Sequence, residues 1–260
     1  MIRGLWSRET VALVLVLAMA PLAATWLMAM RGDGLLRLLS ALAVVYGWQL
    51  IFLMIRAQPP SLAGIVTALA IAMLAPTGLG PVAFVLGASF GVVIGELVFG
   101  GWGRNILHPA TVAVAFLGFG YPAAPWPDLA IPAAWGALGT LVVALAFGLY
   151  SMRLIGGAAI ALTFAALAGL PVLDPFVAPA ILAPMALLVC DPVTSASTQS
   201  GRWGQGLLYG GLVALFLGAW TSASALQVAL SAALLANLAA PLLDELALLA
   251  WRSRRRRHHG

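Results

Sequence analysis

Long runs of apolar residues alternate with short polar connections along nearly the whole chain. A helix of about 20 apolar residues is long enough to cross a bilayer, and ten apolar segments can be drawn. They cover residues 11–30, 34–55, 61–76, 81–99, 106–120, 129–150, 154–172, 175–190, 204–221 and 226–250. The third, fifth and eighth segments are short, so we expect tilted, re-entrant or half-length helices there. The pattern predicts an all-α, polytopic transmembrane helical bundle of about ten helices, some of them short or broken.

Two polar interruptions, at residues 100–111 and 190–198, stand out from the apolar background. Each contains a polar residue followed by Pro-x-Thr, as His108-Pro109-Ala110-Thr111 and as Asp191-Pro192-Val193-Thr194. Broken helices at membrane depth persist only where protein or a cavity satisfies their freed backbone groups. Paired, Pro- or Gly-broken segments are therefore the best sequence-level indication of a binding site.

Each interruption has a purely structural and a functional interpretation. If the fifth helix starts at Asn105, this residue is its N-cap, Pro109 lies in the first turn and His108 shares the face of Asn105. The same amide, ring and free N–H groups could instead bind an aromatic heterocycle or an anion. Asp191 similarly predicts a local Asx turn, although a carboxylate at the end of a span is costly unless it binds something.

The fourth segment contains glycines at four-residue spacing, Gly87, Gly91 and Gly95, followed directly by Glu96. Small residues at this spacing favour close approach of a neighbouring helix. An ionisable residue inside a span is a functional candidate, and the alternative is that Glu96 pairs with Arg104.

Composition places most of the chain in lipid: 63% of residues are hydrophobic, only 8% are charged, and the mean hydropathy is +1.05. An ordinary soluble domain has about 25% charged residues. The basic residues are all Arg and concentrate at the C-terminus without a nucleic-acid motif, so we expect contact with lipids and not with nucleic acid. The lone Cys190 is typical of a small apolar filler, and no metal site is expected.

Arginines in short loops also predict the topology. With the C-terminal Arg cluster in the cytoplasm, Arg56, Arg104, Arg153 and Arg202 all fall on the cytoplasmic side, and only the 31–37 connection departs from the rule. We expect one integral domain over residues 1–260 of a bacterial inner membrane protein, with both termini cytoplasmic. Residues 251–260 are expected to form a basic tail, and segment 11–30 is expected to be a retained helix, not a cleaved signal.

The polar interruptions resemble a known membrane family. Phe99-Gly100-Gly101-Trp102-Gly103-Arg104-Asn105-Ile106-Leu107-His108-Pro109-Ala110-Thr111-Val112 looks like its F-G-G-x-G-x-N-[IP]-F-N-P-A-M segment. The stretch from Asp191 to Ser195, with Gly201-Arg202 and Tyr209-Gly210, is similar to its A-T-D-P-V-[ST]-[SA]…x-G-R-x-x-[FY]-G segment, and residues 61–69 are similar to its third helix. The family comprises the NqrB subunit of sodium-pumping NADH:quinone oxidoreductase and the RnfD subunit of the Rnf electron-transport complex.

The resemblance implies a ten-helix subunit of two related halves, about 9–120 and 129–250, with a non-covalent riboflavin and with other membrane and peripheral subunits as partners. It carries over Asn105, His108 (where the family usually has Asn) and Asp191 as flavin-binding residues, and less strongly Thr67 and Thr194. Trp102 and Thr111 have the side-chain types that an isoalloxazine ring needs for stacking and hydrogen bonding.

One departure from the family concerns its usual covalent FMN, which is attached to a threonine in an S-G-A-T-type motif. The corresponding loop here is only residues 121–128, and no such string occurs. Residues 191–198 imitate the motif but lack its Gly and have Ser where the acceptor Thr belongs. We therefore expect non-covalent riboflavin or FMN and argue against covalent FMN.

The leading hypothesis is a flavin-binding subunit that relays electrons in an Nqr/Rnf-like complex. Whether this electron transfer is coupled to ion transport is left open. Such a protein is a component of an oxidoreductase and not a self-contained enzyme, so no catalytic residue is assigned. A small-solute or ion channel or transporter with inverted repeats also fits broken helices. A third possibility is an assembly subunit that keeps the fold without a cofactor.

Overall fold

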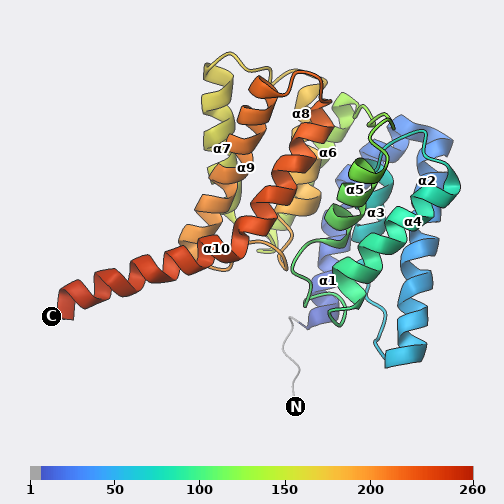
Figure 1. Ribbon diagram of the computed structural model, residues 1–260, viewed down its shortest axis with the longest axis horizontal. Coiled ribbons are helices and arrows are strands. Elements are labelled where there is room, and N and C mark those ends of the chain that lie inside the picture. Colours follow the sequence, from blue (N-terminus) through green and yellow to red (C-terminus); the bar gives the residue numbers. More distant parts are fainter. Residues whose placement is uncertain (1–6, 260) are drawn as a thin grey trace.

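A computed structural model describes the backbone of residues 7–259 and the side chains of residues 7–253, and this part of the chain is helical throughout its regular elements. Its elements are α1 (Arg8–Ala18), α2 (Ala20–Arg56), α3 (Gly64–Leu74), α4 (Pro81–Val92), η1 (Val93–Leu97), α5 (Pro109–Gly120), α6 (Ile131–Ala146), α7 (Met152–Leu167), α8 (Val177–Pro184), η2 (Met185–Val189), α9 (Gln199–Ala219) and α10 (Ala225–His259). Figure 1 shows α1–α5 and α6–α10 as neighbouring groups of one bundle. The predicted all-α helical bundle of ten helices is confirmed, and most side chains of the predicted basic tail lie outside the described residues.

The first two predicted segments are joined by a sharp corner in α2, without a loop. Arg31 has non-helical φ and ψ angles of 51° and −131°, and it separates two legs of α2 that run in opposite directions in Figure 1. A second, milder interruption at Met19 separates α1 from α2, two residues before Pro21. Proline has no N–H to donate and therefore weakens the helix one turn before it.

The short helices end where the sequence places prolines. α3 stops at Ala75, which has extended angles (φ −68°, ψ 147°) because the following residue is Pro76. α8 contains Pro184 and changes into the π-helical segment η2 directly afterwards. The expectation of short third, fifth and eighth segments is confirmed.

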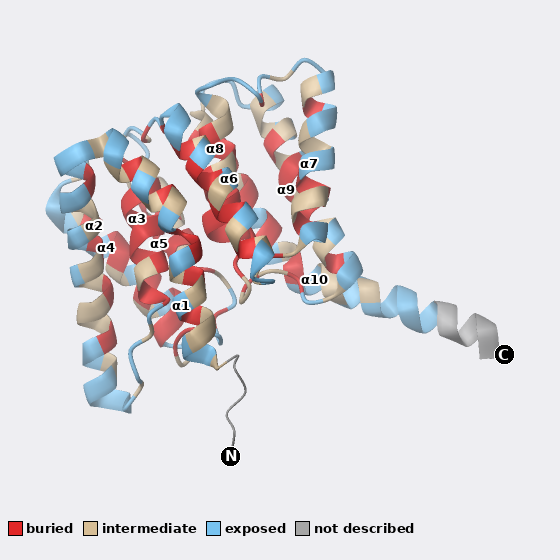
Figure 2. Ribbon diagram, turned by 180° about the vertical axis from the view of Figure 1, so that it is seen from behind, coloured by how far each residue is buried: buried red, intermediate tan, exposed pale blue. Residues whose placement is uncertain are grey.

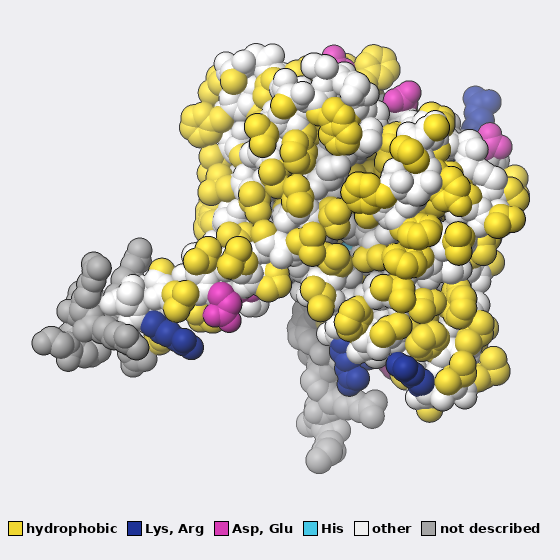
Figure 3. All heavy atoms as spheres, viewed as in Figure 1, with side chains coloured by type: hydrophobic (Ala, Val, Ile, Leu, Met, Phe, Trp, Pro, Cys, Tyr) yellow, Lys and Arg dark blue, Asp and Glu magenta, His cyan; other side chains and the backbone are white. Residues whose placement is uncertain are grey.

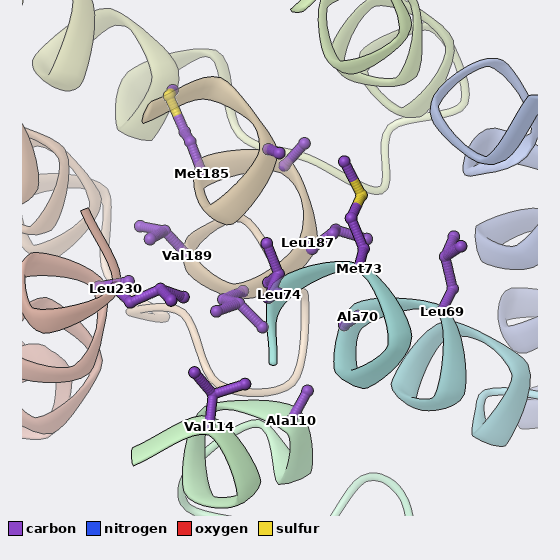
Figure 4. Packing of buried hydrophobic residues seen from close by; sticks show 14 of the residues in the cluster. Leu69, Ala70, Met73, Leu74, Ala110, Val114, Met185, Leu187, Val189 and Leu230 are labelled. Carbon is purple, nitrogen blue, oxygen red and sulfur yellow. The ribbon is translucent and has the colours of Figure 1, made fainter. Parts of the chain in front are cut away.

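These short helices form the centre of the molecule, as the concentration of buried residues in Figure 2 shows. A helix that is apolar all round belongs in a core or a membrane, and α3 is buried over nearly its whole length. Figure 4 shows three elements meeting there, α3, η2 and α5, through Met73, Leu74, Leu187, Val189, Ala110 and Val114. The core therefore lies next to both polar interruptions.

The glycines of α4 allow α5 to approach closely, as their spacing predicted. A Cβ atom on Gly91 would lie 2.6 Å from the carbonyl oxygen of Pro109 and 2.7 Å from the backbone nitrogen of Ala113. A Cβ atom on Gly87 would overlap the side chain of Leu117. This contact fixes the start of α5, where the first interruption ends.

The outer flank of the bundle is apolar, and charged side chains gather toward its two ends in Figure 3. Among the described residues, two helices are long and apolar enough to cross a membrane by length and composition, Ala20–Arg56 and Ala225–Ser253.

Candidate functional site

The first interruption is a glycine-rich loop between η1 and α5. Gly100, Gly101 and Gly103 have φ angles of 105°, 87° and 93°, a region that glycine adopts without strain. The buried Asn105 closes this loop, because its Oδ1 accepts from the N–H of Gly103 at 3.2 Å and its Nδ2 donates to the carbonyl of Leu107 at 3.1 Å. Asn105 therefore determines the shape of the loop.

The N-cap of α5 is His108, and the expectation that Asn105 caps this helix is wrong. The helix begins at Pro109, whose fixed φ suits the first position, and the preceding His108 is extended (φ −62°, ψ 131°). Nδ1 of His108 accepts from the N–H of Ala110 at 3.2 Å. A neutral ring that accepts at Nδ1 has its proton on Nε2, so Nε2 can donate to a ligand.

The second interruption contains the Asx turn that the sequence predicted. Oδ2 of the buried Asp191 accepts from the N–H of Val193 at 3.2 Å and from the N–H and hydroxyl of Thr194, both at 3.0 Å. Oδ1 makes no hydrogen bond to the part of the chain that the structure describes. One carboxylate oxygen thus holds the turn, and the other is available as an acceptor.

The two interruptions approach each other, although they are far apart in the sequence. The charge of Asp191 acts on both His108 and Glu96. Glu96 is 1% exposed within η1, and it interacts with Arg8 and with the backbone of Trp102. The alternative that Glu96 pairs with Arg104 is therefore wrong: Arg8, at the start of α1, is the cation that acts on it.

The other predicted site residues differ in what they contact. Trp102 is covered on one face by the Arg8 guanidinium, 5.9 Å from the ring centroid. Thr194 is committed to the Asp191 turn, and Thr67 is buried in α3. Thr111 is buried too, but its hydroxyl has no hydrogen-bond partner among the described residues.

Thr111 lines a cavity of about 260 Å³ between α5, the connection after α5, and α10. This volume is near the lower end of small-molecule sites, roughly 300–1,000 Å³. The lining is mostly apolar and aromatic, with a few polar groups: Thr111, Val114, Ala115, Gly118, Phe119, Pro122, Trp126, Trp220, Gln227, Leu230, Ser231 and Leu234. The other predicted site residues do not line it.

Sequence reasoning missed the contribution of α10 to this region. Gln227 and Ser231 lie across the cavity from α5 only because the last helix packs beside the fifth, which no local pattern indicates. Gln205 and Asn237 were missed as well, although both are fully buried. An amide inside an apolar segment is the signal that could have found them, since such side chains hydrogen-bond between helices.

The architecture is that of an apolar helical bundle in which several buried polar residues lie at the two polar interruptions. The sequence profile described as the NQR2, RnfD, RnfE family matches residues 2–133, half of the chain, and the chain belongs to this family. The resemblance predicted from the two interruptions is thereby confirmed.

Curated relatives agree with this assignment. The chain is 27% identical to the NqrB subunit of the Na(+)-translocating NADH-quinone reductase of Stutzerimonas stutzeri, over 78% of this chain and 64% of the relative. It is 28% identical to the same subunit from Ectopseudomonas mendocina, over 76% and 62%. A shorter match, 41% identical, covers 35% of the chain and 22% of the corresponding Klebsiella pneumoniae subunit. The chain thus spans a little under two thirds of the first two relatives.

Proposed function

We propose that this chain is a flavin-binding membrane subunit that relays electrons within a complex similar to NADH-quinone reductase. The observation that carries the proposal is the convergence of His108 and Asp191, which come from two separate broken segments and are both buried. Buried polar groups with unused hydrogen-bonding capacity are costly unless they serve a ligand. The relatives, which are subunits of such a reductase by name, support the redox class.

The side chains around this region suit a non-covalent riboflavin or FMN. Asp191 Oδ1 can accept a hydrogen bond and His108 Nε2 can donate one, which matches the mixed donors and acceptors of a flavin. Thr111, three residues after His108, adds a buried hydroxyl without a partner among the described residues. A bound flavin would supply one- and two-electron chemistry, while these residues bind and orient it.

The same proposal places the bundle across a bacterial inner membrane with both termini cytoplasmic. An apolar flank of this extent is typical of a surface that faces lipid or a partner protein. Arg8 contacts Trp102, and Arg56 donates to the Val98 carbonyl, so these two arginines lie near the same connection, between η1 and α5. Arginines near short loops are typical of the cytoplasmic side. Other subunits of the complex are the proposed partners, and coupled ion transport is proposed by analogy with the relatives' name.

The decisive measurement is the absorbance spectrum of protein purified in mild detergent with added lipid and riboflavin, before and after acid precipitation. We expect a yellow protein whose flavin moves into the acid supernatant. Colour that stays in the pellet would contradict non-covalent binding and point to the hydroxyls of residues 194–198. A colourless, folded protein would overturn the flavin proposal and favour a transporter or an assembly subunit.

A further inference from the structure

The turn that contains Asp191 is attached to the rest of the bundle by two buried amides. The N–H of Ala196 donates to Oε1 of Gln205 at 2.7 Å, and Nε2 of Gln205 donates to Oδ1 of Asn237 at 2.9 Å. Nδ2 of Asn237 then donates to the carbonyl of Leu188 at 3.0 Å. Gln205 and Asn237 are both 0% exposed, and we call this chain of three hydrogen bonds the amide bridge.

The orientation of both amides follows from the groups at the ends of the bridge. An N–H at Ala196 requires an oxygen of Gln205, and a carbonyl at Leu188 requires the NH₂ group of Asn237. The two side chains then meet as donor and acceptor, and each of their polar atoms has a partner. A fully satisfied buried polar network makes its surroundings rigid, whereas a partly satisfied one is costly.

The two ends of the amide bridge bind residues before and after the Asp191 turn. Leu188 lies three residues before Asp191 at the end of the π-helical segment η2, where the last carbonyls have no donor within the helix. Ala196 lies five residues after Asp191, and its carbonyl also accepts from Nε of Arg202 at 2.9 Å. Asn237 sits on α10 one turn beyond Leu234, so the same helix that lines the cavity holds the turn.

We propose that Gln205 and Asn237 are positioning residues, which hold the Asp191 carboxylate at a fixed place for the bound flavin. They act through Asp191 and need not touch the ligand. This inference rests on the proposed function for its ligand. The immobilisation of residues 188–196 does not depend on the ligand, because it follows from the three hydrogen bonds of the bridge.

The test compares Gln205→Met and Asn237→Leu with the unaltered full-length protein in lipid nanodiscs. Amide hydrogen exchange reports the turn, and flavin titration with absorbance spectra reports the site. We expect exchange of the Ala196 amide to accelerate at least about tenfold and flavin to bind about tenfold more weakly, as loss of a buried hydrogen bond implies. The absorbance of the remaining bound flavin should shift, because its hydrogen bond to Asp191 changes.

Tyr209→Phe is the matched control. Tyr209 lies on the same helix as Gln205 and is equally buried, but its hydroxyl donates to the carbonyl of Ile181 in α8, at 2.7 Å. Removing this hydroxyl should lower thermal stability without changing exchange at Ala196 or the flavin spectrum. If a general loss of stability were the cause of weaker flavin binding, Tyr209→Phe would weaken it as much as the two amide variants do.

Each outcome decides one of the two proposals. Unchanged exchange at Ala196 in both amide variants would overturn the bridge, whether or not flavin is present. Faster exchange with unchanged flavin affinity and spectrum would overturn the positioning role. If the unaltered protein binds no flavin but the amide variants still show faster exchange at Ala196, the immobilisation of the turn is supported. The flavin function is then refuted independently of the bridge.

Discussion

Asp191 uses its two carboxylate oxygens differently, and this division gives a residue-level test. Oδ2 accepts three hydrogen bonds within the turn, whereas Oδ1 is free of partners in the described structure. Asp191→Asn keeps an acceptor for the turn but places an NH₂ group where the free oxygen was. We expect flavin affinity to fall by tenfold or more, consistent with about 1.5–3 kcal/mol for a hydrogen bond to a charged group, as measured by fluorescence titration.

Thr194→Val is the control for this substitution, because it removes only one of the three bonds to Oδ2 and leaves Oδ1 unchanged. Its flavin affinity should stay within about threefold of the original, equivalent to less than 1 kcal/mol. Equal losses in the two variants would mean that Asp191 acts only as a turn residue.

Two buried threonines, Thr111 and Thr140, have hydroxyls without a partner in the described part of the chain but occupy different surroundings. Thr111 lines the cavity beside α10, and Thr140 lies inside α6 away from it. Thr140→Val should raise stability by about 1 kcal/mol, because an unpaired buried hydroxyl is replaced by a methyl group of the same shape. Thr111→Val should instead weaken flavin binding about tenfold, if its hydroxyl pairs with the ligand.

Thermal unfolding and flavin titration of both variants check this pair. Stabilisation by both substitutions without any effect on flavin would show that the cavity beside Thr111 is not part of the site.

At the residue scale, sequence reasoning could predict which segments carry the polar chemistry but not how each side chain is used. The Asx turn at Asp191 was predictable because all its partners lie within three residues. The cap at α5 was not, because Asn105 and His108 are both competent caps and the loop glycines decide between them. The role of Arg8 toward Glu96 depends on how α1 packs, which no local pattern contains.

At the scale of elements, the contact between α4 and α5 gives a sharper prediction than any single hydrogen bond. A methyl group on Gly91 would overlap Ala113 and clash with the Pro109 carbonyl. This carbonyl is a backbone group, so it cannot avoid the clash by a change of rotamer. Gly91→Ala should lower stability by about 1–3 kcal/mol. It should also loosen flavin binding, because the displaced start of α5 carries the His108 cap.

Gly211 is the matched control, since it is also helical but has nothing within 4 Å of its ideal Cβ position among the described residues. Gly211→Ala should be neutral or stabilising by up to about 1 kcal/mol, because alanine favours a helix more than glycine does. Thermal unfolding of both variants measures the difference. If Gly91→Ala is as stable as Gly211→Ala, the close approach of α4 to α5 is wrong.

Element boundaries were predictable where proline or glycine marks them, and less so elsewhere. Pro76, Pro109 and Pro184 each coincide with an end or a change of helix type, as their missing N–H requires. The corner at Arg31 occurs in a connection that the sequence indicated only as polar. The π-helical segments arise from packing of the short helices in the core, and periodicity alone cannot distinguish them from α-helix.

At the scale of the whole molecule, the two ends of the bundle should lie on opposite sides of the membrane. Residues 121–128 follow α5 at the end opposite the polar interruptions, and the Pro125 carbonyl accepts from Thr77 there. The start of α9 follows the second polar interruption and contains Arg202. Single cysteines at the exposed positions Ala123 and Ser200 report the two ends, in a background where the native Cys190 is buried. Ala123→Cys should react with a membrane-impermeant maleimide in intact spheroplasts, and Ser200→Cys only after permeabilisation, because arginine-rich loops stay in the cytoplasm. The reverse labelling would invert the topology, and labelling of both positions from outside would contradict a membrane-spanning bundle.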